Sequence, residues 1–276
     1  MASDLLAGSS KLESLPGWLS IRLQRFCGWF GFLMIGPFVL WLIKRKGYNF
    51  PDQELIRSKF KEIRHKQKKH NKRNNKNAEN PHINQKRNLL ICANHLTMID
   101  SVILQTYFAS FWHYAFHYGD FAWNVPAQEV FANRWYFRVV LYLSKCIPID
   151  RMGSKQHHEK IVQQMKAALD LGDPFIVFPE GGRSRTGRFD MERLTYGIGR
   201  LLKEDKNLEV LCVYLRSDKQ DKVSDLPPVN SNFYCNFELL KPQTDQKGLR
   251  ADRDLAMQVG HKIQELEEQY FNLKSI

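Results

Sequence analysis

A histidine and an aspartate in the first half of the chain have the spacing needed for acid–base chemistry. Residues 89–93 are apolar and indicate a short buried strand, His95 follows it, and Asp100 opens a second apolar run with helical character. A carboxylate is electrostatically favoured at the start of a helix, and from there Asp100 can reach one ring nitrogen of His95. That contact would fix the tautomer and leave the other nitrogen to accept a proton. The alternative is a helix-capping aspartate beside an ordinary loop histidine.

A second polar loop, residues 179–187, follows another short apolar strand at 175–178. Its glycines would let backbone N–H groups approach an anion closely, and its arginines supply positive charge. Ligands of open α/β sheets bind beyond the carboxyl ends of the strands, so we expect both polar loops to face one crevice. The candidate binding residues in this loop are Glu180, Gly181, Gly182 and Arg183.

The two loops in this order resemble two sequence blocks of the glycerolipid acyltransferase family. Residues 94–100 match its Asn-His-x-x-x-x-Asp block, and residues 178–184 match its Phe-Pro-Glu-Gly-x-Arg-Ser block. The best-known members, the 1-acylglycerol-3-phosphate acyltransferases, convert lysophosphatidic acid to phosphatidic acid. The resemblance spans roughly residues 89–216. It implies His95 as general base, no metal or cofactor, and either acyl-CoA or an acidic acyl carrier protein as the acyl donor.

The resemblance also implies how the acceptor would be held. Arg151, after a brief predicted strand at 146–149, matches the family arginine that contacts the acceptor's phosphate, although a plain surface pair with Asp150 is the alternative. Arg183 would hold the same phosphate, and Glu180 would orient the loop or the glycerol hydroxyl. The chain departs from the family pattern at Gly182, where threonine is usual, and at 208–215, which lacks the usual proline. An amino-acid-derived, aryl or polyene lipid acceptor is therefore a second possibility.

Several other kinds of chemistry are disfavoured by the sequence. The chain has no GxSxG, HExxH or P-loop motif, which argues against a serine hydrolase, a zinc hydrolase and a nucleotide enzyme. Its five cysteines form no CxxC pair, a pattern typical of reduced thiols in the cytosol. His157 and His158 are adjacent in a predicted helix and do not share a face, so we expect them to be solvent-exposed rather than metal ligands.

The N-terminal part of the chain is predicted to anchor it to a membrane. Residues 27–43 carry no charge and are followed by Lys44, Arg45 and Lys46, while residues 18–26 indicate an amphipathic interfacial helix. We expect residues 1–50 to form either a monotopic helix pair or one tilted span. A signal peptide is disfavoured because no small-residue cleavage site follows. The basic cluster places the catalytic domain on the cytoplasmic face of the inner membrane.

The net charge of +12 is concentrated in one segment. Residues 59–88 hold eleven Lys and Arg against Glu62 and Glu79. We expect residues 51–88 to form a solvated or loosely helical basic connector that lies against an anionic membrane surface. An inert linker and a nucleic-acid patch are the alternatives. No nucleic acid is expected, because no aromatic residue follows Phe60 in this segment for base stacking.

From residue 89 onward, apolar runs alternate with helical patterns, which predicts an α/β domain over 89–276 with a mixed sheet flanked by helices. The expected strands are 89–93, 113–117, 146–149, 175–178, 209–215 and 233–240. The expected helices are 100–108, 134–143, 154–171, 191–203 and 251–271. The aromatic face of helix 134–143 is interpreted as core, or alternatively as the wall of an acyl-chain slot. The prediction is thus a membrane-bound acyltransferase acting on a lysophospholipid, with a non-catalytic protein that binds anionic surfaces as the alternative class.

Overall fold

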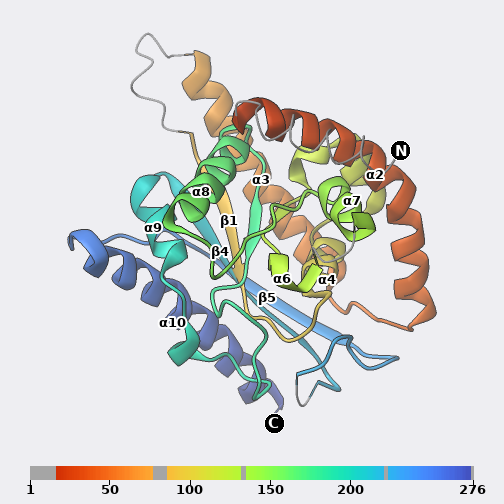
Figure 1. Cartoon of the computed structure of the whole chain (residues 1–276). Helices are drawn as coiled ribbons and strands as arrows, with labels where there is room; N and C mark the ends of the chain where they lie inside the picture. The colour runs from red at the N-terminus through yellow and green to blue at the C-terminus, as the bar shows by residue number, and fades with distance from the viewer. Residues whose placement is uncertain (1–16, 77–85, 132–134, 221–222, 275–276) are drawn as a thin grey trace.

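The computed structural model describes residues 17–76, 86–131, 135–220 and 223–274. Its centre is a five-stranded sheet in the order β2-β3-β1-β4-β5, of which the first four strands are parallel and β5 runs antiparallel to β4 (Figure 1). The strands are β1 (Asn88–Ala93), β2 (Trp123–Asn124), β3 (Phe175–Val177), β4 (Leu208–Ser217) and β5 (Phe233–Leu240). The mixed α/β sheet predicted from the sequence is confirmed.

Helices cover both faces of this sheet (Figure 1). The α-helices are α2 (Gly17–Arg45), α3 (Gln53–Lys76), α4 (Asp100–Phe108), α5 (Phe111–Phe116), α6 (Gln128–Phe131), α7 (Trp135–Leu143), α8 (Lys155–Asp170), α9 (Gly197–Glu204) and α10 (Gly248–Lys274). Two short 3₁₀ helices are η1 (Tyr118–Asp120) and η2 (Met191–Arg193). The predicted helices at 100–108, 134–143, 154–171 and 251–271 are confirmed within a few residues at their ends.

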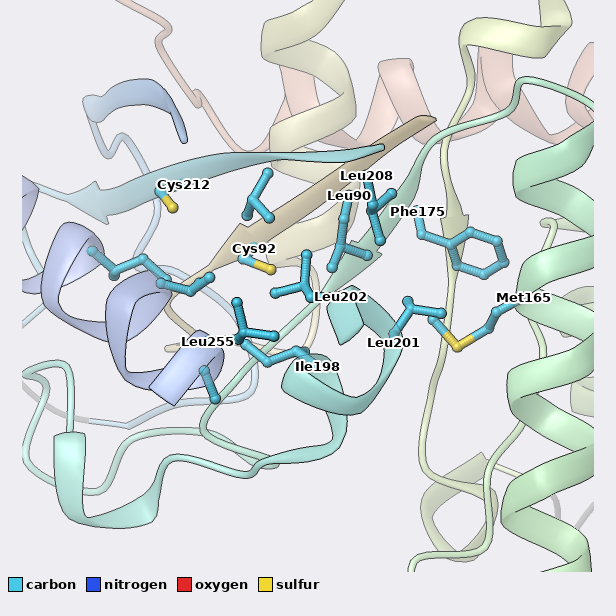
Figure 2. Close-up of a cluster of buried hydrophobic side chains, with 14 of the residues drawn as sticks. Leu90, Cys92, Met165, Phe175, Ile198, Leu201, Leu202, Leu208, Cys212 and Leu255 are labelled. Carbon is cyan, nitrogen blue, oxygen red and sulfur yellow. The ribbon is translucent and has the colours of Figure 1, made fainter. Parts of the chain in front are cut away.

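Alternate residues of β1 belong to two separate cores, as expected for a central strand buried on both faces. Leu90 and Cys92 pack with the apolar faces of α8, α9 and α10, the cluster drawn in Figure 2. Leu89 and Ile91 point the other way and pack with α3 and α4. The strand therefore has no solvated face, which explains why it reads as a continuous apolar run rather than an alternating one.

The strand register brings the two polar loops to one edge of the sheet. Leu90 of β1 pairs with Phe175 of β3 in parallel, so the chain leaves both strands at the same end. Asn94, directly after β1, ties this end to the neighbouring strand, because its side-chain amide donates to the Leu215 carbonyl and accepts from the Leu215 N–H. The loop carrying His95 and the loop carrying Glu180 thus start side by side.

Residues 113–117 are not a strand, contrary to the prediction. They belong mainly to the short helix α5, whose first turn is capped by the Ser110 hydroxyl, which accepts a hydrogen bond from the His113 N–H. The strand in this region is β2, where buried Trp123 pairs with Phe175. The run of aromatic residues at 111–116 has high strand propensity, but the serine cap and packing against α2 decide for a helix.

Two further element predictions are corrected. Residues 146–149 form only isolated bridges, Cys146 with Asn124 and Ile149 with Ala127, rather than a strand. The helix expected at 191–203 is divided into η2 and α9.

The predicted connector contains one continuous helix, α3, whose first part is not solvated. Ile56 and Phe60 are buried in the core on the α4 side of the sheet, and the side chains of Arg64 and Gln67 are buried as well. These four residues recur at helical spacing and share one face. Arg64 can occupy that face because its guanidinium pairs with buried Asp120. The basic residues that point away from this face gave the segment its polar sequence pattern.

Among the described residues of the N-terminal segment, residues 17–45 form one helix, so the predicted amphipathic stretch 18–26 and apolar stretch 27–43 are continuous rather than a helix pair. Figure 1 shows α2 bending partway along its length, and Pro37 lies inside it, where it removes a backbone hydrogen-bond donor. One side of α2 packs against α5, α7 and α8, with Ile21 and Gln24 buried. Gly28 and Gly31 allow the close approach, since a Cβ on Gly31 would lie 2.6 Å from the Leu143 Cβ. Among the described residues α2 is the one helix long and apolar enough to cross a membrane.

Candidate active site

His95 and Asp100 are paired as the sequence predicts. The His95 Nδ1 lies 3.0 Å from the Asp100 Oδ2, across the turn between β1 and α4. The side chain of Asp100 is 5% exposed and that of His95 is 18% exposed. The buried carboxylate holds Nδ1 as a proton donor, so Nε2 of a neutral His95 is the basic nitrogen and can accept a proton.

The Asp100 carboxylate also organises the turn that carries the histidine. Its Oδ2 accepts hydrogen bonds from the backbone N–H groups of Leu96 (2.6 Å) and Thr97 (2.8 Å), and its Oδ1 accepts from the Thr97 hydroxyl. All of these bonds run back to residues that precede α4. Asp100 is therefore more than a helix-capping residue, because its side chain fixes the loop and the imidazole together.

The second polar loop closes over the first. The ring of His95 stacks on Phe178 with a centroid separation of 4.0 Å, and the Ser184 N–H donates to the His95 carbonyl at 2.7 Å. The His95 N–H in turn donates to Glu180 at 3.0 Å. These contacts confirm that the loops after β1 and β3 meet in space. Phe178 covers one face of the imidazole, and the two backbone hydrogen bonds fix the position of His95 in its loop.

Glu180 lies beneath the loops rather than in an accessible position. It is 2% exposed, and its carboxylate accepts from the backbone N–H groups of His95 and Asp190. Burial raises the pKa of Glu180 to about 8, and the two N–H donors only partly oppose that shift. Of the two roles expected for Glu180, these contacts correspond to orienting the loop and give no access to a substrate hydroxyl.

The glycine pair shapes the loop and brings basic residues beside it. Gly181 has a left-handed backbone (φ +64°), a conformation that favours glycine. A Cβ built on Gly182 would lie 3.2 Å from the Arg193 side chain and 3.8 Å from that of Arg151. Two guanidinium groups therefore converge on Gly182. The absence of a side chain at this position, where the family usually has threonine, leaves room for both.

Arg151 is half-exposed and lies 3.6 Å from Glu129. The loop before it is held by the two adjacent histidines of α8, since the Asp150 N–H donates to the His157 Nε2 and the Asp150 carbonyl lies 3.0 Å from the His158 Nε2. The expectation that these histidines are solvent-exposed is wrong. They are partly buried and fix the position of the Arg151 loop.

Arg183 has partners outside the glycine pair. Its guanidinium pairs with Asp225 at 2.6 Å and donates to the Ser224 carbonyl. Arg183 and Arg151 therefore have different ion-pair partners, Asp225 and Glu129. The guanidinium of Arg193 lies beside Gly182 and donates to the Arg183 carbonyl. Sequence reasoning missed Arg193 because it lies outside both motifs, in a segment read only as part of a helix.

The aromatic face of α7 is not core, contrary to the preferred interpretation. Trp135 is 72% exposed, and Leu141 is the buried residue of the described helix. The exposed apolar side chains of α7, which packs against α2, are Trp135, Tyr136, Phe137, Val139 and Val140. The alternative, a wall for an acyl chain, stays a prediction.

Comparison with known proteins identifies the family to which the chain belongs. No curated protein gives a significant match to the chain. The Acyltransferase family model matches residues 66–213, which is more than half of the chain and contains both polar loops, Arg151 and Arg193. The match begins within α3, upstream of the domain boundary at residue 89 that the sequence predicts. The chain therefore belongs to the Acyltransferase family, that of the glycerolipid acyltransferases.

Proposed function

We propose that this protein moves a fatty acyl group from a thioester, acyl-CoA or an acyl carrier protein, to the hydroxyl of a lysophospholipid, most simply lysophosphatidic acid. The observation that carries the proposal is the His95–Asp100 pair, with Nδ1 held at 3.0 Å by a buried carboxylate. An alcohol is a poor nucleophile at neutral pH and needs a positioned base as it attacks. Nε2 of His95 is that base in this site.

The reaction proceeds through a tetrahedral intermediate. As the acceptor oxygen forms a bond to the thioester carbon, its proton passes to the His95 Nε2, and Asp100 stabilises the imidazolium. The C–S bond then breaks, and the leaving thiolate takes the proton from His95 as the free thiol. The products are the esterified acceptor and CoA or carrier protein, and His95 returns to its neutral form.

The acceptor's phosphate binds where positive charge converges on Gly182. Arg151 and Arg193 approach this position from separate elements, the loop before α8 and η2. A guanidinium offers a planar fork that matches phosphate oxygens. Glu180 keeps the loop in place through the His95 and Asp190 N–H groups rather than by touching the acceptor.

The protein acts at a membrane surface with its catalytic domain on the cytoplasmic face of the inner membrane. The outward side of α2 exposes Phe30, Met34, Phe38 and Trp41, while its inward side packs on the domain. A helix fixed along the domain in this way supports a monotopic attachment rather than a separate spanning helix. The active site would then lie at the level of lipid headgroups, where lysophospholipids are found.

The test is an acyl-transfer assay over a panel of lyso-acceptors with both CoA and carrier-protein donors. His95→Ala should reduce transfer by about 10²–10⁴-fold, and Asp100→Asn should reduce it severely through loss of the correct tautomer. His261→Ala, an exposed histidine on α10, is the matched control and should retain full activity. Activity of His95→Ala within about tenfold of the wild type would overturn the mechanism.

A non-glycerophosphate acceptor, such as an amino-acid-derived, aryl or polyene lipid, is the second candidate. Two observations favour this second candidate. Glycine stands at position 182, where the family usually has threonine, and the Arg183 guanidinium forms an ion pair with Asp225. The same panel decides between the candidates. Turnover of a neutral or zwitterionic acceptor that exceeds turnover of lysophosphatidic acid would make the second candidate the preferred one.

A further inference from the structure

A large cavity lies at the opposite end of the parallel strands from His95. This cavity of about 1040 Å³ is lined by α2, α3 and two segments, residues 115–119 and 170–173, that precede β2 and β3. It therefore lies at the amino ends of the parallel strands, whereas His95 follows the carboxyl end of β1. This cavity is separate from the catalytic site and takes no part in the mechanism above.

The wall of the cavity is strongly basic. Six Lys or Arg side chains line it, against the two carboxylates of Asp170 and Asp173. The six come from α2, α3 and the segment just before β1: Arg22, Arg25, Arg64, Lys68, Lys72 and Lys86. An excess of like charge around one hollow repels itself and favours an anionic occupant.

Some of these cations are neutralised within the fold. Arg25 pairs with Asp173 at 2.9 Å, and Arg64 and Lys68 both pair with buried Asp120. Burial disfavours the ionised form of Asp120, yet Arg64 and Lys68 still lower its pKa to about 2. These paired side chains form the rigid part of the wall.

The remaining cations have no carboxylate partner within 4 Å among the described residues. Arg22 lies over the ring of Trp18, and Lys86 donates to the backbone carbonyl of Asp170. Lys72 is exposed on α3 and has no ion pair with any described acidic residue. Arg22 and Lys72 come from different helices and line the same hollow, so an anion between them would be held from two sides.

The rim of the cavity is apolar where it meets the outer face of α2. Phe26 and Phe116 are 61% and 78% exposed and line the cavity together with the basic residues. Trp29 also lines the cavity and is tied to α5, because its indole N–H donates to the Ala115 carbonyl at 2.9 Å. An occupant that satisfies both parts of the site has an anionic head and apolar chains.

The geometry points to a binding site for the phosphate headgroup of an anionic membrane phospholipid, with the acyl chains leaving along the exposed face of α2. The inference rests on the membrane location proposed above, but not on acyl transfer. The site would hold the domain in one orientation on an anionic bilayer, with Arg22 and Lys72 on the phosphate and Phe26 and Phe116 against the chains.

The experiment measures flotation of the full-length chain with phosphatidylcholine vesicles that contain or lack phosphatidylglycerol. The double variant Arg22→Gln/Lys72→Gln should lose the preference for phosphatidylglycerol by roughly tenfold or more while binding neutral vesicles as the wild type does. Lys59→Gln/Arg73→Gln is the matched control, since it removes the same charge from exposed residues of α3 that do not line the cavity. The control should keep most of the preference.

Two results would overturn the proposal. Equal losses in the two double variants would show diffuse attraction rather than a site. Binding of inorganic phosphate that the Arg22→Gln/Lys72→Gln variant loses, together with an unchanged preference of that variant for phosphatidylglycerol vesicles, would show a site for free phosphate. Arg22→Lys/Lys72→Arg keeps both charges and should restore the preference, which separates loss of the contact from loss of the fold. Acyl transfer is assayed in parallel, so failure of the catalytic proposal is seen independently.

Discussion

Asp100 shows how one buried side chain can fix both a catalytic ring and the loop that carries it. Its Oδ2 accepts from the backbone of Leu96 and Thr97 as well as facing the His95 ring, so displacement of the carboxylate would disturb all three contacts. These contacts hold the carboxylate in place before the reaction begins. The imidazolium that forms during transfer is therefore stabilised by a charge already in place, which needs little reorganisation.

The arginines around Gly182 give a prediction at the residue scale. The sequence motif alone predicts the larger effect for Arg183→Lys, but the Arg183 guanidinium is bound to Asp225, whereas Arg151 lies beside Gly182. Arg151→Lys should therefore raise the KM for a phosphorylated acceptor about ten- to a hundredfold, the cost of a lost charge-assisted contact, and leave the donor's KM nearly unchanged.

Arg183→Lys is the comparison for that prediction and should have the smaller effect on the acceptor. Steady-state kinetics with each substrate varied in turn provides the measurement. If both lysine variants used a phosphorylated acceptor as well as the wild type does, the phosphate assignment would be wrong.

Glu180 gives a prediction about pH. Its pKa is about 8 in the folded protein because of burial and has its ordinary value, 4.5, without the fold. Between these values the folded state binds more protons than the unfolded state, so the contribution of Glu180 to the free energy of unfolding is fully present below pH 4.5 and is lost as pH rises through 8. Urea unfolding in non-ionic detergent across this range should show the decline, and Glu180→Gln, which cannot titrate, should flatten it.

Glu192→Gln is the matched control because Glu192 is exposed in the neighbouring 3₁₀ helix, and it should leave the slope unchanged. An identical slope in wild type and Glu180→Gln would show that the carboxyl of Glu180 does not hold a proton in this range.

At the scale of elements, α9 packs so closely against α10 that the contact requires a glycine at position 199. A Cβ on Gly199 would lie 1.8 Å from the Asp252 carbonyl oxygen, a backbone atom that cannot move without shifting α10. These two helices cover one face of β1 and β4 and complete the core in Figure 2. Their packing therefore supports the strands that carry the site.

Gly199→Ala should lower the free energy of unfolding by about 1–3 kcal/mol or more, because the helices must separate to admit the methyl group. Gly197→Ala is the control on the same helix, since a Cβ there meets no atom within 4 Å. It should be neutral or stabilise by up to about 1 kcal/mol. Thermal unfolding of the two variants measures the difference, and equal midpoints would contradict the packing argument.

At the scale of the whole molecule, the apolar surface and the folded core are joined through α2. Ile21 is buried in the core on the α8 side, and Ile43 is buried in the core on the α4 side. The outward face of the same helix carries Met34 and Phe38, 80% and 57% exposed. The helix thus belongs to the domain on one side and is available to a bilayer on the other.

Met34→Glu/Phe38→Glu should therefore release the protein from membranes while keeping its fold. Loss of two apolar side chains from the bilayer removes about 3 kcal/mol or more, over a hundredfold in partition. Leu249→Glu, at a position on α10 that is at least as exposed, should leave partition unchanged. Flotation with neutral vesicles measures this. Unaltered partition of the double variant would place the membrane contact elsewhere, with α7 the first candidate.

From the sequence alone, deletion of residues 1–46 is expected to give a protein that is soluble or bound to membranes only in a salt-sensitive way. The packing of α2 gives a different expectation: the truncated chain should aggregate, because Ile21, Gln24 and Ile43 would leave uncovered apolar and polar positions in the domain. A monomeric, detergent-free truncated protein with native unfolding behaviour would show that α2 is a dispensable anchor.

The sequence by itself determined the parts of the protein that depend on local spacing. It located β1, β3, β4 and β5 as apolar runs, and it located the helix α8. It also located the His95–Asp100 pair, because five residues across a strand–turn–helix leave few ways to place the two side chains. It also identified α2 as the long apolar helix, since that property depends on composition alone.

Only the tertiary structure decided the contacts between distant segments. Arg183 pairs with a residue 42 positions later, and Arg193 reaches Gly182 from outside both motifs. The aromatic residues at 111–116 form a helix that packs against α2. One face of α3 packs in the core, although the many lysines of this segment make its sequence pattern polar. These outcomes depend on which surfaces meet in three dimensions. Local propensity is worth only tenths of a kcal/mol per residue, and packing against a distant element overrides it.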